Sequence, residues 1–227
     1  MRILVNINKV DFRFGNLVKP LEKLDIALGV VVGKLDKDVI DRFNPDIVIH
    51  NGFLKSDGFI EIPIGHITYS LLGPFTALSS SEVDVKYNSD ICYIGDVKDF
   101  GNDLYQLMDQ YNFKLFSHIA YSFPSYCGNL TQENTGKAYK SAKVSVVPLN
   151  DFGYREMDII VSDGNPVKFQ NKEQFFSDVH DGVNGKKFAT NYTKEEILEK
   201  HTNFDKLSKV FKDIGLTQLA SQVKELK

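Results

Sequence analysis

Two side chains of opposite charge, Arg155 and Asp158, lie three residues apart in the segment REMDIIVSDGNPVKF at 155–169. This segment is typical of a helix that ends in a Gly-Asn-Pro turn and leads into a short strand. A spacing of three residues places both side chains on one face of a helix, so a guanidinium and a carboxylate can bind one ligand together. The alternative is an exposed ion pair within the helix, which the same spacing allows.

Three glycine-bearing turns accompany the expected strands in this part of the chain. Gly95 lies in YIGDVKDFGN, Gly128 lies in YCGNLTQEN, and Gly164 lies in the Gly-Asn-Pro turn. In open parallel sheets, ligands bind beyond the carboxyl ends of the strands, where glycine lets backbone N–H groups approach phosphate and helix N-termini add partial positive charge. The order of the turns therefore favours a phosphate-bearing ligand.

The elements that would position these residues alternate between strand and helix. The first half of the chain contains apolar runs typical of strands and two segments with apolar residues at helical spacing. The strand-like runs are 2–7, 26–32, 46–50, 59–64 and 66–70, and the helix-like segments are 15–24 and 36–43. This alternation is typical of a parallel sheet with crossover helices.

A second alternation follows a polar stretch at 73–89. Its expected elements are strands at 90–96, 113–120 and 143–149, helices at 102–112 and 131–142 (with Thr131 as N-cap), the segment 172–183 without an assigned structure, and a helix-rich tail at 193–227. We predict an α/β protein with two Rossmann-like lobes, each containing a parallel sheet, and a helical C-terminus. The predicted boundaries are an N-terminal lobe at 1–80, a linker at 81–89 and a C-terminal lobe with the C-terminal helices at 90–227.

The bulk composition is that of an ordinary globular protein. With 227 residues, a formal net charge of −3 and a pI near 6.0, the chain has no general electrostatic attraction for nucleic acid. The longest apolar run, at 26–33, is too short to cross a bilayer, so we expect a cytoplasmic protein with no membrane partner. Cys92 and Cys127 are expected to be free thiols in a reducing compartment.

Several common site signatures are absent from the sequence. There is no Gly-x-Gly-x-x-Gly dinucleotide fingerprint and no Gly-x-Ser-x-Gly hydrolase turn. The segment NTGKA at 134–138 lacks the upstream glycine and the final Ser or Thr of a phosphate-binding loop. The five histidines show no metal-ligand spacing.

Three motifs together resemble the nucleotide-sugar lobe of GT-B glycosyltransferases, in particular the phage DNA glucosyltransferases and the spore-maturation-type glycosyltransferases. They are CYIGD, CGNLTQENTGKAYKSAKVSVVPL and YREMDIIVSDGNPVKF. In these families a strand ending in Gly begins the lobe, a Gly turn precedes a helix, and an Arg-x-x-Glu helix leads to a small turn and a hydrophobic strand. The resemblance covers about residues 88–200. It implies a compact GT-B-like fold, in which the sheets of an acceptor lobe and a nucleotide-sugar lobe face each other across a cleft.

The resemblance also implies roles for particular residues. Gly95 would let the backbone approach the donor phosphates, and Gly128 would open the base-binding turn. Arg155 would pair with the diphosphate, because its fork of donors suits phosphate oxygens. Asp158 would accept hydrogen bonds from the ribose hydroxyls, although these families usually have the longer Glu there. Three further residues would contribute to the donor site: Lys98, Asn129 and Gly164.

No motif of these families marks a catalytic base in the N-terminal lobe. The two candidates are Asp11, in the loop after the first expected strand, and His50, at the carboxyl end of the run 46–50. As a general base, His50 would need a pKa near neutrality and reach to an acceptor hydroxyl. The alternative for each residue is a structural role, such as a histidine hydrogen-bonded at a strand end. The scheme requires no cofactor and leaves a divalent cation optional.

The expected function is transfer of a sugar from a nucleoside diphosphate sugar, UDP-linked by resemblance, to a hydroxyl acceptor. The alternative is a glycosyltransferase-like nucleotide-binding or scaffold protein that has lost the chemistry. The acceptor is open: the phage enzymes suggest a modified base in DNA, and a small molecule, a glycan or a protein is the other choice. A local basic patch for DNA could come from Lys9, Lys19, Lys34 and Lys55.

Overall fold

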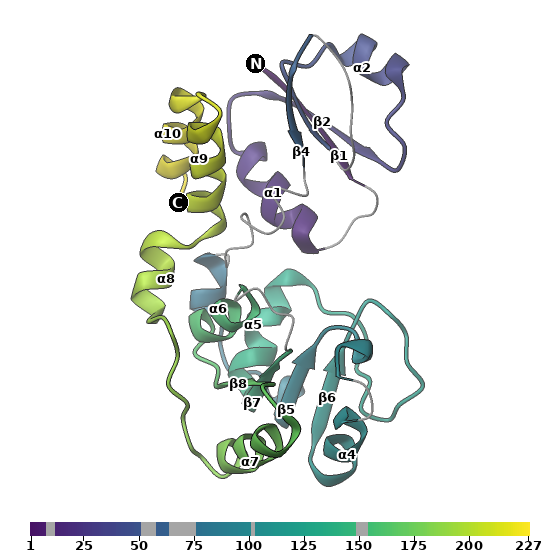
Figure 1. Cartoon of the computed structure of the whole chain (residues 1–227), viewed down its shortest axis with the longest axis vertical. Coiled ribbons are helices and arrows are strands. Elements are labelled where there is room, and N and C mark those ends of the chain that lie inside the picture. The colour runs from purple at the N-terminus through teal and green to yellow at the C-terminus, as the bar shows by residue number, and fades with distance from the viewer. Residues whose placement is uncertain (8–11, 51–57, 64–75, 101–102, 149–153) are drawn as a thin grey trace. The chain divides into compact units, whose positions relative to one another are not determined.

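The structure is a computed structural model that describes residues 1–7, 12–50, 58–63, 76–100, 103–148 and 154–227. The chain divides into two compact units (Figure 1). The first consists of residues 1–73 and 201–227, and the second consists of residues 74–200. Each unit is built on its own four-stranded parallel sheet. The predicted α/β class, with two parallel sheets and a helical C-terminus, is confirmed.

The first unit begins with the alternation predicted from the apolar periodicity. Its elements are β1 (Arg2–Ile7), α1 (Phe12–Glu22), β2 (Ala27–Val32), α2 (Lys37–Phe43), β3 (Ile47–His50) and β4 (Ile60–Pro63). The strand order is β2-β1-β3-β4. The chain therefore adds strands first on one side of β1 and then on the other, which creates a topological switch point between β1 and β3. The strand expected at 66–70 lies outside the described residues.

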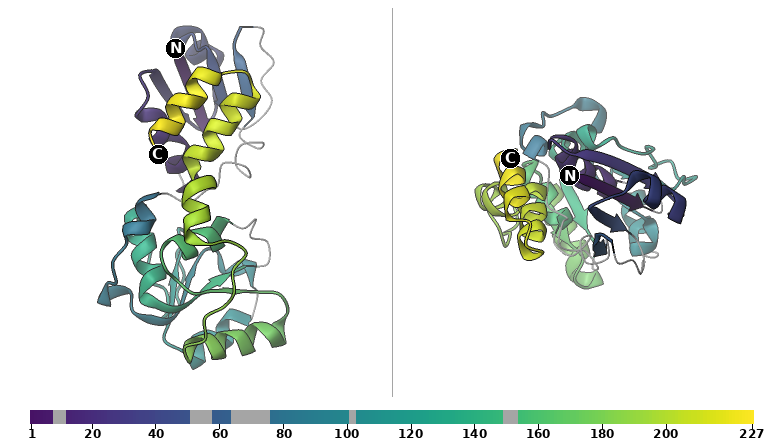
Figure 2. Two further views of the ribbon diagram at one scale, coloured as in Figure 1. Left: turned by 90° about the vertical axis from the view of Figure 1, so that its left-hand side faces the viewer. Right: turned by 90° about the horizontal axis from the view of Figure 1, so that it is seen from above.

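The two C-terminal helices, α9 (Asn203–Asp213) and α10 (Thr217–Glu225), belong to the first unit and not to the second lobe, where the sequence analysis placed them. Figure 2 shows them side by side against the first sheet. Phe204, Phe211 and Val223 share one apolar core with Val5 of β1 and Leu21 of α1. This core buries apolar surface that neither the sheet nor the helices could bury alone, which explains why the chain returns to its first unit.

The second unit repeats the strand order of the first. Its strands are β5 (Ser89–Ile94), β6 (Phe113–Phe116), β7 (Ala142–Val147) and β8 (Pro166–Lys168), in the order β6-β5-β7-β8. Its helices are α4 (Asp103–Gln110), α5 (Gln132–Ser141), α6 (Tyr154–Val161), α7 (Lys172–Val183) and α8 (Lys194–Lys200). The switch point of this sheet lies between β5 and β7.

Helices cover both faces of the second sheet, as in a Rossmann-like lobe. On one face, Leu104 of α4 and Phe175 of α7 pack with Tyr93 of β5. On the other face, Tyr139 of α5 and Ile159 of α6 pack with other strand residues. Alternate residues of β5 and β7 therefore enter opposite cores, which is why successive residues such as Ile91, Cys92 and Tyr93 are all buried.

The stretch predicted as a linker, 81–89, packs against the second unit. Two short 3-10 turns, η1 (Thr76–Ser80) and η2 (Val85–Tyr87), precede β5. Within the stretch, the Asp84 N–H donates to Ser141 Oγ at 2.8 Å. Leu78, which the prediction placed in the first lobe, is buried with Met157 and Ile160 of α6 and belongs to the second unit. Most residues of this stretch are exposed or half-buried, which explains its polar sequence. This polarity led to its prediction as a linker.

Both cysteines are free thiols, as the sequence predicted. Cys92 is buried in β5, and Cys127 is exposed. Among the described residues, none of the helices combines the length and the apolar character that a membrane crossing requires.

Candidate functional site

The candidate site lies at the carboxyl edge of the second sheet, beside the switch point between β5 and β7. Gly95 directly follows β5, and its N–H donates to the Phe116 carbonyl oxygen at the end of β6 at 2.9 Å. Arg155 lies in the first turn of α6, the helix that follows β7. Since parallel strands end at the same edge, the topology brings these two residues of distant sequence together.

Gly95 and Arg155 are close neighbours, joined by the buried side chain of Tyr93. Arg155 Nη1 donates to Tyr93 Oη at 3.5 Å, and the guanidinium carbon lies 5.6 Å from the centre of the Tyr93 ring. A Cβ placed on Gly95 would lie 3.1 Å from Arg155 Nη1 and only 2.5 Å from Tyr93 Oη. Glycine is therefore required here by the close approach of these two side chains, and the guanidinium is held over the end of β5.

Arg155 and Asp158 both lie on α6, as the spacing predicted, and both are half-buried. The hydroxyl of Tyr139, on α5, is within the electrostatic reach of both. Burial raises the pKa of Tyr139 well above its ordinary value, while the Arg155 charge lowers it and the Asp158 charge raises it. The two charges therefore act on one buried hydroxyl, that of Tyr139.

Gly128 also lies at the carboxyl edge of the sheet, next to the end of β6. Its carbonyl oxygen accepts from the Ser117 N–H at 3.0 Å, and its φ of +90° is one that glycine adopts without strain. Asn129, which follows, is exposed, and so is Lys98, whose N–H donates to Asp96 Oδ1 at 2.9 Å. Two of the three predicted turns thus meet at this edge.

Asp96 and Tyr121 were not singled out from the sequence. Tyr121 Oη donates to Asp96 Oδ1 at 2.6 Å and accepts from the Val97 N–H at 3.2 Å. Burial opposes ionisation of Asp96, but the hydrogen bonds from Tyr121 and the Lys98 N–H outweigh it and lower the pKa of Asp96. Burial and the Asp96 hydrogen bond raise the pKa of the Tyr121 hydroxyl. An ionised carboxylate therefore lies directly after Gly95 at the rim of the site.

Glu156 is a second missed residue. Its side chain is only 4% exposed, and its Oε2 lies 2.8 Å from Nζ of Lys168 at the carboxyl end of β8. The available signal was its spacing: Glu156 lies three and four residues before Ile159 and Ile160, so it shares their buried face of the helix. Asp and Glu are rarely buried without a partner. The pair fixes the first turn of α6 to the sheet, and Arg155 belongs to that turn.

Gly164 lies at the opposite edge of the sheet from Gly95. α6 runs back along the sheet, and Asn165 Nδ2 donates to the carbonyl oxygen of Lys143 near the start of β7 at 3.3 Å. A Cβ on Gly164 would lie 3.1 Å from the carbonyl oxygens of both Ile159 and Tyr139. The glycine thus allows the end of α6 to pack closely against α5, away from the Arg155 side of the unit.

The two candidate bases belong to the first unit. Asp11 lies outside the described residues. His50 is 1% exposed at the end of β3, and its Nε2 lies 3.6 Å from Oε2 of Glu61 on β4. In this conformation, the His50 side chain is closed off from solvent.

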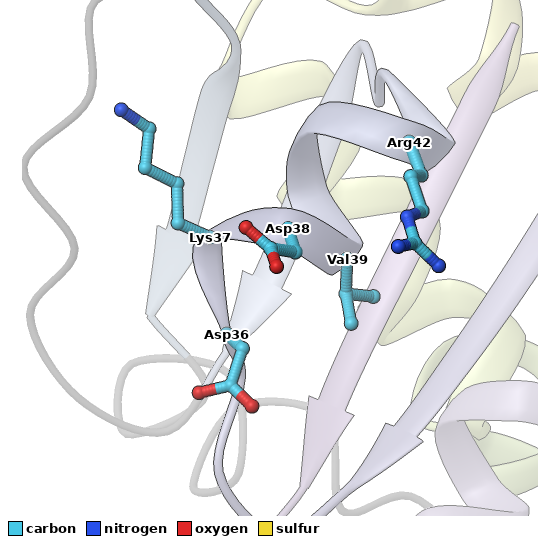
Figure 3. Close-up of a pocket in the computed structure, with 5 residues that line it drawn as sticks. All are labelled: Asp36, Lys37, Asp38, Val39 and Arg42. Carbon is cyan, nitrogen blue, oxygen red and sulfur yellow. The ribbon is translucent and has the colours of Figure 1, made fainter.

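A separate polar pocket of about 430 Å³ lies around the start of α2 (Figure 3). Its lining consists of Asp36, Lys37, Asp38, Val39 and Arg42. None of the predicted site residues lines it, and α2 has only seven residues. We therefore assign no chemistry to this pocket.

Within the part of the chain that the structure describes, no three His, Cys, Asp or Glu side chains cluster where they could hold a metal ion. The comparisons with known proteins add no assignment: the sequence matches no family model and no curated protein at a significant level.

Proposed function

We propose that the second unit binds a nucleoside diphosphate sugar and that the chain is a glycosyltransferase of the GT-B type. The observation that carries the proposal is the position of the Arg155 guanidinium over Gly95 at the switch point of the second sheet. Open parallel sheets bind their ligands at such points, and a guanidinium with a nearby helix N-terminus suits a diphosphate.

Catalysis would rest on stabilisation of the leaving group. Arg155, the N-terminus of α6 and Lys98 would neutralise the diphosphate as the glycosidic bond breaks. Asp158 would accept hydrogen bonds from the ribose hydroxyls. A base in the first unit would take the proton of the acceptor hydroxyl, and a divalent cation is optional in this scheme.

Calorimetric titration tests the donor site directly. We expect UDP and at least one UDP-sugar to bind. We expect the other nucleoside diphosphates to bind at the same site with a different affinity. If none of these compounds bound at millimolar concentration, the donor-site assignment would be abandoned.

The second candidate is a binding or scaffold protein that has kept the donor site and lost catalysis. The burial of His50, 1% exposed, favours it, because a general base has to reach the acceptor hydroxyl. Slow donor hydrolysis separates the two functions, since many active transferases pass sugar to water. Donor binding with neither hydrolysis nor transfer across a panel of acceptors would favour the scaffold.

The acceptor is part of the proposal. Lys19 and Lys34 are exposed in the first unit, while Lys9 and Lys55 lie outside the described residues. A modified base in DNA would require such local positive charge, because the net charge is −3. A gel shift with modified and unmodified duplexes that weakens with salt would support DNA, and its absence would favour a small molecule, a glycan or a protein.

A further inference from the structure

β2 forms an outer edge of the first sheet and consists only of uncharged, mostly apolar residues, ALGVVV. Val30 is 41% exposed and Val32 is 54% exposed, although both are aliphatic. The glycine that follows, Gly33, has open space around it, since a Cβ placed there would meet no atom within 4 Å. A long apolar edge strand of this kind pairs readily with another strand.

The other three edges within the described parts of the two sheets carry features that discourage such pairing. β4 carries Glu61 and ends at Pro63. β8 has only three residues and begins with Pro166. The outer edge of β6 is covered, because Tyr126 forms a parallel bridge with Leu115. Charge, proline, shortness and coverage are the usual means of protecting an edge, and β2 shows none of them among the residues that the structure describes.

The backbone of β2 shows which groups this edge presents. The Ala27 N–H donates to the Met1 carbonyl oxygen at 3.0 Å, and the Gly33 N–H donates to the Ile7 carbonyl oxygen at 2.7 Å. In a parallel ladder, alternate residues direct both N–H and C=O to the same neighbour. The odd-numbered residues of β2 therefore face β1, and Leu28, Val30 and Val32 direct their backbone groups outward.

We propose that two copies of this chain associate by antiparallel pairing of β2 with β2 about a two-fold axis at Val30. This register places Val30 opposite Val30 and Leu28 opposite Val32, so that all three outward residues are paired. Each pair exchanges two N–H···O bonds, and the two sheets become one. The exposed valines of the two copies cover one another on the same face of that sheet.

The charges at the two ends of the strand identify a second copy as the occupant. Asp25, exposed, precedes β2, and Lys34, 89% exposed at its side chain, follows it, with its Nζ 3.5 Å from Oδ1 of Asp36 in the same chain. Antiparallel pairing brings Asp25 of one copy close to Lys34 of the other. In the register at Val30, Lys34 lies opposite Ile26, next to Asp25 of the other copy. The contact is isologous, so it closes at a dimer.

Analytical ultracentrifugation of the full chain over a range of micromolar concentrations tests the proposal. We expect the mass of a dimer at the high end and its loss in Val30→Lys. The matched control is Ile60→Lys, because Ile60 is 40% exposed and lies on the opposite edge strand, β4. The control should keep the dimer. A monomer at every concentration, a dimer that persists in Val30→Lys, or a dimer lost in both variants would overturn the proposal.

A spin label at Val30→Cys tests the register. Cys127 is exposed and would also be labelled, so the variant is made in a Cys127→Ser background, while Cys92 is buried. We expect dipolar broadening of the spectrum that disappears on dilution with unlabelled protein. The same label at Ile60→Cys should give a narrow spectrum. No broadening at position 30 in a dimeric sample would overturn the assigned register.

Discussion

The guanidinium of Arg155 packs over the ring of Tyr93, with its central carbon 5.6 Å from the ring centre and Nη1 3.5 Å from the hydroxyl oxygen. The Tyr93 hydroxyl in turn donates to the Asp96 carbonyl oxygen at 3.0 Å. A buried aromatic residue of the strand therefore orients a cation that belongs to the following helix. Such orientation lowers the entropy cost of binding an anion, because the long Arg side chain is already ordered.

Replacement of Arg155 by alanine should weaken donor binding much more than folding. Loss of a charge-assisted hydrogen bond costs roughly 1.5 to 3 kcal/mol of binding free energy. The lost contact with the Tyr93 ring should lower the free energy of unfolding by only about 0.5 to 1 kcal/mol. UDP titration and thermal melting measure the two effects. Arg42→Ala in the first unit is the control, and equal affinity in both variants would remove Arg155 from the donor site.

A Gly95→Ala substitution should both destabilise the second unit and disturb Arg155. The new methyl group would lie 2.5 Å from Tyr93 Oη and 2.8 Å from Cζ, and the fully buried ring has little room to move. Overpacking of this kind costs about 1 to 3 kcal/mol. Urea unfolding should show this loss, and Gly58→Ala, where no atom lies within 4 Å of the added Cβ, should not.

The double variant Gly95→Ala/Tyr93→Phe refines this test. Removing the hydroxyl removes the shortest contact of the added methyl group, so part of the stability lost in Gly95→Ala should return. If the double variant were less stable than the sum of the two single changes, the clash with Tyr93 would not be the cause.

The sequence was informative wherever a local pattern determines structure. The helix predicted at 131–142, with Thr131 as its N-cap, is α5 (Gln132–Ser141), and Thr131 is its N-cap residue. Apolar periodicity and capping act within a few residues, so they can be detected in one sequence. The helices α9 and α10 show the limit: an amphipathic helix reveals which face it buries but not which sheet it covers.

The residues of the candidate site could likewise be predicted only in part from the sequence. Gly95 and Arg155 were singled out through the order of motifs. Tyr93 was missed because an aromatic residue in a strand indicates core packing equally well. Asp96 and Tyr121 were missed because they lie 25 residues apart, and no local pattern shows that their side chains meet. Gly164 was assigned to the donor site together with Gly95 because both lie in turns. The two glycines lie at opposite edges of the sheet, because a helix that follows a parallel strand returns the chain to the amino-terminal edge.

Gly164→Ala should therefore reduce stability without changing donor affinity. The added methyl group would meet Ile159 Cγ2 at 2.7 Å and two backbone carbonyl oxygens at 3.1 Å, which cannot move without shifting α5 or α6. We expect a lower melting temperature and an unchanged dissociation constant for UDP, measured well below the melting transition. Weaker binding by the folded variant would instead place Gly164 in the donor site.

Glu156→Gln should lower the free energy of unfolding by about 1 to 3 kcal/mol, because it breaks a charged hydrogen bond that is buried at one end. The Lys168 ammonium, 35% exposed, keeps partial access to water, which limits the cost. Glu199→Gln is the control, since its pair with Lys200 is exposed at both side chains, and such pairs contribute about 0 to 1 kcal/mol. Equal effects of the two substitutions in urea unfolding would contradict a structural role for the buried pair.

The ion pair of Asp90 with Lys143 should make stability fall in acid. The hydrogen bond from Lys143 Nζ, 2.7 Å from Asp90 Oδ1, lowers the pKa of Asp90, burial opposes this, and the Asn112 N–H adds to the lowering. A depressed folded-state pKa stabilises the protein above the unfolded-state value of about 4, and this contribution is lost as pH falls through the folded-state pKa.

At neutral pH, Asp90→Asn should therefore be less stable than the parent by about 0.5 to 1.5 kcal/mol. The difference should shrink below about pH 4. Urea unfolding across this range measures it, with Asp109→Asn, an exposed substitution on α4, as the control. A difference that stayed constant with pH would show that the charge of Asp90 does not hold the start of β5 to β7.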